Sequence, residues 1–263
     1  MNKKFLTGFF TIMSLGSAAV QAEVNACGKQ PTLEQKVQKT LDIAEIQNVT
    51  SAHAYYHGAT MHQAEIEKIW SKRDDITWTN NTDRYNNRKS VWTFYVENSK
   101  QFPLKGSMAY HMLTTPIVEV ADDGKTAKAI YMSFGNVSGI IGPNNFAAMW
   151  TQEKYGMDLI KENGKWKIWH LRTYVDFYTP VGKNWLNTED NLVAMDVLKL
   201  QGKKLEETKG ATVNAEPGFV FKFEEPDEKK VFYEGYTKER IVKLAPELPQ
   251  PYCTWSDIAS KAF

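Results

Sequence analysis

The feature that most constrains this chain is an Asn163-Gly164 pair between two runs of alternating apolar and polar residues. Both central positions of a tight hairpin turn need positive φ, and Asn-Gly adopts this conformation readily. We therefore predict a hairpin within residues 150–185. Side chains two apart in a strand point to the same face. The second strand is thus expected to present one row of side chains: Trp166, Ile168, His170, Arg172 and Tyr174.

The N-terminal segment has the pattern of a cleavable signal peptide. A basic start precedes an apolar run, and small residues stand just before Glu23. We expect residues 1–22 to be removed after Ala22 and the protein to be periplasmic or secreted. The apolar run falls short of the roughly 20 residues that a membrane span needs, so no stable span is expected in the mature chain. A lipoprotein anchored at Cys27 is an open alternative.

Export makes the two cysteines interpretable. An oxidising compartment favours pairing, so a disulfide between Cys27 and Cys253 is expected to tie the two tails together. Two free thiols are the alternative.

The net charge of +1 over 263 residues gives no indication of a nucleic-acid partner. The aromatic content of 13% is high, and a wide apolar cavity is one use for it.

Periodicity predicts helices first and strands afterwards. A helix is expected from the cap Thr32 to Gly58, then helices over 61–71 and 91–98, separated by a short strand at 76–78 and a polar loop over 79–89. Strands over 106–120 and 126–134 follow, and the Gly-rich segment 135–145 is predicted to be a flexible connection. This order indicates an α+β fold in which N-terminal helices cover one face of a curved antiparallel sheet.

The last part of the chain has a different character. Residues 186–263 lack the apolar periodicity for a core of their own. A helix is predicted over 189–200 and a short strand over 219–223, with a charged run over 203–209 between them and an extended proline-rich run over 246–251. We expect this C-terminal extension to wrap the first domain or a neighbouring subunit.

Three pieces of sequence resemble one family. They are the helix end Tyr55-Tyr56 with residues 65–70 behind it, the strand beginning Tyr110-His111, and the hairpin over 155–166. Together they resemble the SnoaL-like group of the nuclear transport factor 2-like superfamily, which includes polyketide cyclases and dehydratases. The resemblance implies a cone-shaped sheet over residues 23–185, closed by helices around a deep apolar pocket. Fold alone does not settle function, because this superfamily supports several chemistries.

His111 is the first candidate for chemistry. The resemblance places it where dehydratase-type members have a histidine that faces the pocket. A neutral imidazole there would remove a proton next to a carbonyl and return it to a departing hydroxide. The alternative is a half-buried strand histidine bonded to backbone.

His170, Arg172 and Tyr56 are predicted to assist. Arg172 would bind a carboxylate or an enolate oxygen through its forked donors, and His170 would act as a second acid. The alternative for Arg172 is a structural ion pair with Asp158 or Glu153. Tyr56, favoured over Tyr55 by its helical spacing, would donate to an oxyanion, although buried tyrosines more often serve packing. Further residues are expected to line the pocket: Tyr155, Trp150, Trp78, His57 and Trp166.

One departure from the family pattern affects the mechanism. The dehydratase branch has an aspartate after its helix tyrosine, where this chain has His57. His57 itself, Asp176 or Glu97 would then have to take over the aspartate's role. His53, His57 and His62 have a spacing that suits zinc, but the Glu of H-E-x-x-H and an assured third ligand are missing, so no metal and no other cofactor is expected.

The sequence therefore favours an exported, cofactor-independent lyase or isomerase that acts through His111 on a hydrophobic or aromatic oxygenated small molecule. The rival is a non-catalytic periplasmic protein that binds a small molecule, or a partner, through the same fold. A homodimer is a further expectation that the sequence leaves open.

Overall fold

The computed structural model describes residues 24–97, 108–142, 145–186, 225–242 and 244–263. The helical elements in this part of the chain are α1 (Leu33–Gly58), α2 (His62–Lys68), α3 (Arg88–Trp92), the π-turn η1 (Thr93–Glu97) and the 3₁₀ turns η5 (Trp255–Asp257) and η6 (Ala259–Lys261). The strands are β1 (Thr77–Thr79), β2 (Asp83–Tyr85), β3 (Met108–Val120), β4 (Thr126–Gly142), β5 (Asn145–Glu162), β6 (Lys165–Pro180) and β7 (Glu228–Lys229). Within the described residues they form one sheet in the order β3-β4-β5-β6-β1-β2-β7, antiparallel except at β1–β6. The predicted α+β fold with N-terminal helices on a curved, mostly antiparallel sheet is confirmed.

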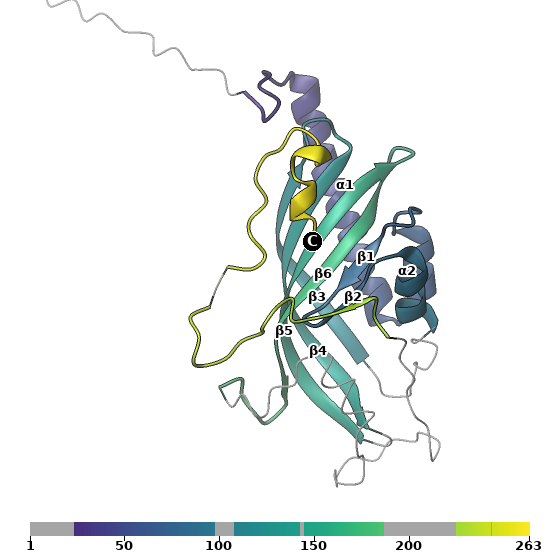
Figure 1. Cartoon of the computed structure of the whole chain (residues 1–263), viewed down its shortest axis with the longest axis vertical. Helices are drawn as coiled ribbons and strands as arrows, with labels where there is room; N and C mark the ends of the chain where they lie inside the picture. The colour runs from purple at the N-terminus through teal and green to yellow at the C-terminus, as the bar shows by residue number, and fades with distance from the viewer. Residues whose placement is uncertain (1–23, 98–107, 143–144, 187–224, 243) are drawn as a thin grey trace, which may run out of the picture.

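Helix α1 begins where its cap predicts. Thr32 Oγ1 accepts from the Gln35 amide at 3.2 Å, and the Gln35 side chain accepts from the Thr32 amide at 2.9 Å, which completes a capping box. Ile46, Thr50 and His53 are buried at helical spacing. This face of α1 packs on one side of the sheet, and Figure 1 shows α1 behind the sheet and the C-terminal segment in front of it. We call the side that faces α1 the inner face.

The predicted hairpin is present, and the sheet continues beyond the prediction at its other end. Asn163 and Gly164 both have positive φ between β5 and β6. Strand β4 runs on to Gly142, so the prediction of a flexible connection over 135–145 is wrong. At Gly135 a Cβ would lie 2.2 Å from the carbonyl oxygen of Tyr110 on β3. Glycine therefore marks a close approach of two strands here, not a loop. The predicted loop 79–89 likewise contains β2.

A β-bulge divides the side chains of β6 between the two faces. Met157 pairs with Leu171 and Leu159 pairs with Ile168, so one extra residue, Trp169, is inserted on β6. Ile168 and Leu171 both join the inner core, although they are three apart. The prediction that His170, Arg172 and Tyr174 share a face with Trp166 and Ile168 is therefore wrong, and they lie on the outer face.

The C-terminal segment covers part of that outer face. The Phe263 amide donates to Asp158 at 2.8 Å, and Arg172 donates to the Phe232 carbonyl at 2.6 Å. At the far end, Cys27 and Cys253 form a disulfide beside the β3–β4 turn. The predicted signal peptide and the elements predicted over 189–200, 203–209 and 219–223 lie outside the described residues. The division of the chain at residue 185 stays a prediction.

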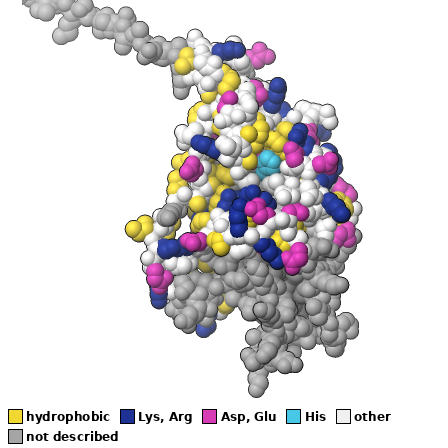
Figure 2. Space-filling view, viewed as in Figure 1, with side chains coloured by type: hydrophobic (Ala, Val, Ile, Leu, Met, Phe, Trp, Pro, Cys, Tyr) yellow, Lys and Arg dark blue, Asp and Glu magenta, His cyan; other side chains and the backbone are white. Residues whose placement is uncertain are grey.

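Among the described helices, none has the length and apolar character needed to cross a membrane. On the face shown in Figure 2, basic and acidic side chains are interspersed, in line with the small net charge.

Candidate functional site

Four of the five histidines gather on the inner side of the sheet. His53 and His57 lie one turn apart on α1, His62 opens α2, and His111 comes from β3. The ring centroid of His57 is 4.8 Å from that of His62 and 5.2 Å from that of His111. Side chains from two helices and an edge strand thus surround the imidazole of His57. We call these four side chains, with Glu65 and Glu153, the inner cluster.

Glu65 is the carboxylate at the helical side of the inner cluster. It is fully buried, and its Oε1 accepts from His53 Nδ1 at 2.7 Å and from Trp70 Nε1 at 2.9 Å. Its Oε2 lies 3.3 Å from His62 Nδ1. Burial opposes ionisation of Glu65, but the neighbouring imidazoles, led by His53, outweigh it and hold the pKa of Glu65 far below its ordinary value. Glu65 is therefore a buried anion at neutral pH.

His57 has the opposite character. Its Nδ1 is buried and makes no hydrogen bond within the described residues. Burial, followed by the charges that His62 and His111 carry when protonated, holds the pKa of His57 well below its ordinary value. His57 is therefore a neutral imidazole at neutral pH, with a ring nitrogen open to a further partner. The donor atoms of His57, His62 and Glu65 lie within 4.8 Å of one another, which is a spacing that a metal ion can span.

His111 pairs with a carboxylate of its own. Its Nδ1 lies 2.6 Å from Glu153 Oε1, and both side chains are buried. Thr151 and Tyr178 donate to the same oxygen at 2.9 and 3.2 Å. Burial alone would raise the pKa of Glu153, but His111 and these hydroxyl donors outweigh it and lower that pKa. A carboxylate this close to an imidazole stabilises the positive charge that the imidazole gains as a general base.

The depressed pKa of Glu153 predicts how stability depends on pH. Its stabilising effect is fully present above the unfolded pKa, near 4.5, and is lost as the pH falls through the lower folded value. We expect the excess stability of the wild type over Glu153→Gln to shrink on acidification, by at most about 1.4 kcal/mol per pH unit. Urea unfolding of both proteins across the acid range measures this, and a difference that does not change with pH would refute it.

Two buried phenols complete the inner side. The Tyr155 ring lies 5.8 Å from that of His53 and 6.5 Å from that of His111. The Tyr95 ring lies 5.4 Å from that of His62. Burial raises the pKa of both phenols well above the ordinary value, so both keep their protons and serve only as neutral donors. Tyr155, which the sequence predicted to line the pocket, is thus brought together with His53 and His111.

Other predicted residues lie at a distance from this centre. Trp78 is buried in an aromatic stack, 4.1 Å from Phe94 between ring centroids, and Trp166 donates its indole N–H to Asp42 of α1. Tyr56 is half-buried, with the Lys68 ammonium over its ring. Trp150 stacks on Phe134 and is 38% exposed. The contacts of Trp78 and Trp166 are those of core packing.

His170 and Arg172 are separated from His111 by the sheet itself. His170 Nδ1 lies 2.9 Å from Asp158 Oδ2, and its ring packs against those of Trp169 and Trp255. Arg172 lines a pocket between the outer face and the C-terminal segment. The prediction that both assist His111 in one cavity is therefore wrong, because the bulge at Trp169 turns them outward.

The sequence reading missed the two carboxylates and Tyr95. Glu153 stands between Thr151 and Tyr155, which alternate onto the inner face, so a charged residue at an apolar-face position was the available signal. Glu153 is the carboxylate beside His111, a part for which the sequence offered His57, Asp176 or Glu97. Asp176 instead pairs with Lys154 at 2.6 Å on the outer side. Glu65 is three residues after His62, a helical spacing that places both on one side of α2.

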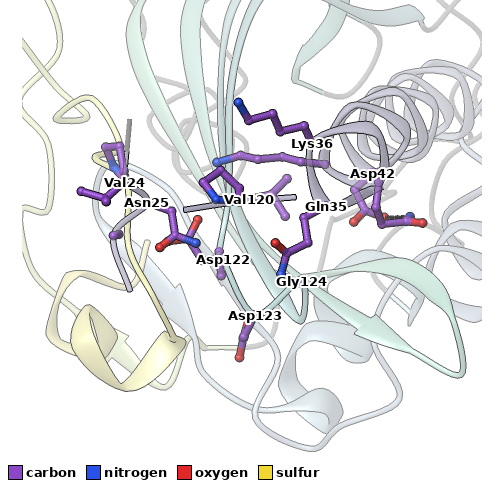
Figure 3. Close-up of a pocket in the computed structure, with 15 residues that line it drawn as sticks. Val24, Asn25, Gln35, Lys36, Asp42, Val120, Asp122, Asp123 and Gly124 are labelled. Atoms are coloured by element: carbon purple, nitrogen blue, oxygen red, sulfur yellow. Dashed lines mark hydrogen bonds between the residues drawn. The ribbon is translucent and has the colours of Figure 1, made fainter. Parts of the chain in front are cut away.

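A further pocket lies at the disulfide end of the molecule. Figure 3 shows the side chains of Asn25, Gln35 and Asp122 around it, contributed by the N-terminal segment, α1 and the β3–β4 turn. The predicted site residues do not line this pocket. We therefore keep the inner cluster as the candidate site.

Comparison with known proteins places the fold in a family. The SnoaL-like domain family matches residues 38–172, just over half of the 263 residues. No curated protein matches the chain.

Solved structures similar to this chain include a protein of unknown function from Mycobacterium tuberculosis, with 16% identity, 62% of this chain and 86% of that chain covered, and a TM-score of 0.45. A hexachlorocyclohexane dehydrochlorinase from Novosphingobium barchaimii has 16% identity over 56% of this chain and 94% of its own, with a TM-score of 0.45. A nuclear transport factor 2-like protein with a cystatin-like fold from Novosphingobium aromaticivorans has 16% identity over 54% and 87%, with a TM-score of 0.41. From the family match and the α+β sheet described above, the chain belongs to the SnoaL-like domain family.

Proposed function

We propose that this protein is a lyase or isomerase that acts on an apolar, oxygenated small molecule, with His111 as the general base. The observation that carries the proposal is the buried pair of His111 Nδ1 and Glu153 Oε1, 2.6 Å apart. The SnoaL-like family, with its dehydratases, is consistent with it. The location expected from residues 1–22, periplasmic or secreted, is part of the proposal, and the Cys27–Cys253 disulfide supports it.

The pair suits proton transfer at carbon. Glu153 lies against the imidazole and stabilises the positive charge that His111 gains when it removes a proton next to a carbonyl. The same proton then leaves with the departing hydroxide in a dehydration, or returns to a neighbouring carbon in an isomerisation. One imidazole thus acts first as base and then as acid.

The buried tyrosines supply the hydrogen-bond donor that the reaction needs in addition to a base. An enolate oxygen needs a donor in a water-poor site, and a neutral phenol offers one without bringing a charge into it. Tyr155 belongs to the inner cluster's surroundings, within 6.5 Å of His111 between ring centroids. It takes the supporting role first expected of Tyr56, His170 and Arg172.

The test is a turnover screen. Hydroxy-ketones and related aromatic alcohols are incubated with the purified protein, and mass spectrometry reports the loss of one water or an isomeric product. We expect His111→Gln to lose about 10²- to 10⁴-fold in kcat, the usual contribution of general acid–base catalysis. Glu153→Gln should lose less kcat and shift its pH profile, because Glu153 acts on the reaction only through the charge of His111.

A contrary outcome favours the rival function. If His111→Gln keeps full activity on a substrate that the wild type converts, His111 is not the base. If the protein binds members of the panel and converts none, the non-catalytic small-molecule binder replaces the enzyme.

A further inference from the structure

We propose that His57, His62 and Glu65 form a binding site for a divalent transition-metal ion. The proposal goes beyond the function above, because metal binding requires neither the proton-transfer chemistry nor His111. It also replaces the expectation from the sequence that no metal is bound, since Glu65 is the third ligand that the sequence did not reveal.

The spacing of the donor atoms fits a small ion. All three lie within 4.8 Å of one another. His62 Nδ1 and Glu65 Oε2 are 3.3 Å apart. Ligands at about 2.0–2.1 Å from a tetrahedral zinc ion are about 3.3 Å from each other, so this pair already has the separation of two neighbouring ligands.

Hydrogen bonds from neighbouring residues fix the orientation of the Glu65 carboxylate, as is typical of a carboxylate that binds a metal ion. His53 and Trp70 both donate to Oε1 of Glu65, which leaves Oε2 to face His62. Groups that bond the far oxygen of a liganding carboxylate fix its orientation and tune its affinity for the metal. Glu65 and His62 both lie on α2, so the two ligands are carried by a single rigid element.

A second, independent observation points to a missing partner. His57 Nδ1 is buried and bonded to nothing within the described residues. Buried polar atoms are almost always paired, so each exception calls for an explanation. Glu65 is the hydrogen-bond partner of His53 and His62, and Glu153 lies 2.6 Å from His111 Nδ1, whereas the Nδ1 of His57 has no such carboxylate beside it in the described part of the chain. A metal ion between His57, His62 and Glu65 would take up its ring nitrogen.

The types of ligand limit which metal ions the site would bind. Two imidazoles and one carboxylate form a set used for Zn²⁺ in sites that keep a coordination position open, and for Fe²⁺ in oxygenases. The set excludes Mg²⁺ and Ca²⁺, which take oxygen ligands. The His111 ring is 5.2 Å from that of the proposed ligand His57, so the metal site and the proposed base would be neighbours.

The experiment is calorimetric titration of Zn²⁺ into the full mature chain, freed of any histidine tag and of metal by chelation. We expect one ion per chain. His57→Gln and His62→Gln should each weaken binding by at least about 100-fold, and His53→Gln, which removes a bond to the ligand Glu65, by about 10-fold. His57→Gln is the safest variant for folding, because no hydrogen bond is lost at Nδ1.

His170→Gln is the matched control. It removes the fifth histidine, which is also buried against a carboxylate but lies on the outer face, and it should bind Zn²⁺ as the wild type does. Far-ultraviolet circular dichroism of each variant confirms the fold, and visible absorption of Co²⁺ in place of Zn²⁺ reports histidine ligation in the folded protein.

The proposal is overturned if the wild type takes up no Zn²⁺ at submillimolar concentration. It is equally overturned if folded His57→Gln and His62→Gln bind as tightly as the wild type, or if His170→Gln alone loses the ion. If His111→Gln loses turnover but still binds Zn²⁺, both the metal site and the proposed reaction stand. The two proposals can therefore fail independently.

Discussion

Replacing Cys27 and Cys253 together by serine should lower the free energy of unfolding by about 5 kcal/mol. The bridge closes a loop across 226 residues, and in the chain-entropy model a loop of this length is worth about 5 kcal/mol. The native contacts around it are independent of the sulfurs. The Cys27 amide donates to Asp122 Oδ2 at 3.1 Å, and the Asp123 amide donates to the Cys253 carbonyl at 3.2 Å. The folded ends therefore stay in place while the unfolded chain gains freedom.

Guanidinium unfolding of the wild type and of the double variant in oxidising buffer measures this. Wild type unfolded in the presence of reductant is the control and should agree with the double variant. The double replacement avoids a lone thiol that would form dimers. A loss of less than about 1 kcal/mol would mean that the tails are held by their other contacts alone.

Asp158→Ala should destabilise the fold by about 3–5 kcal/mol, the usual result of removing one partner from a buried ion pair. Asp158 is fully buried on the outer face. Its Oδ1 accepts from Lys128 Nζ at 2.6 Å, and its Oδ2 accepts from the Phe263 amide at 2.8 Å and faces His170 Nδ1 at 2.9 Å. Alanine would leave the Lys128 ammonium buried without its carboxylate and would release the last residue of the chain.

Chemical unfolding of Asp158→Ala is the measurement, with Glu228→Ala as its matched control. Glu228 pairs with Lys230 at 2.6 Å in the open, where water screens the charges, so its removal should leave stability unchanged within error. Equal effects of the two variants would refute the role of Asp158 as the buried anchor of the C-terminal segment.

Local signals predicted the local structure well. The Thr32 cap and the Asn163-Gly164 turn are both properties of a few neighbouring residues, and each appears where expected. The order of helices and strands then fixes the α+β arrangement, because the helices have only the sheet to pack against. The resemblance to the SnoaL-like family added the expectation of a cone-shaped sheet around a pocket.

The candidate site was predicted only in part, because it depends on two kinds of information that periodicity lacks. One is the bulge: a single extra residue at Trp169 reverses the facing of the side chains from His170 to Val175, and nothing in the alternation of β6 marks it. The other is long-range pairing. His111 and Glu153 come from strands that are not neighbours in the sheet, with β4 between them. Their contact crosses β4 beside Gly135, which pairs with both His111 and Thr151 and has no side chain, and it cannot be read from sequence spacing.

The measurement that tests the central claim most directly compares two histidine variants in one assay. The proposed chemistry lies on the inner face, at His111, whereas His170 has a structural part on the outer face. On any substrate that the wild type converts, His111→Gln should lose nearly all turnover and His170→Gln, if folded, should keep it. Turnover that survives in His111→Gln and disappears in folded His170→Gln would contradict the account.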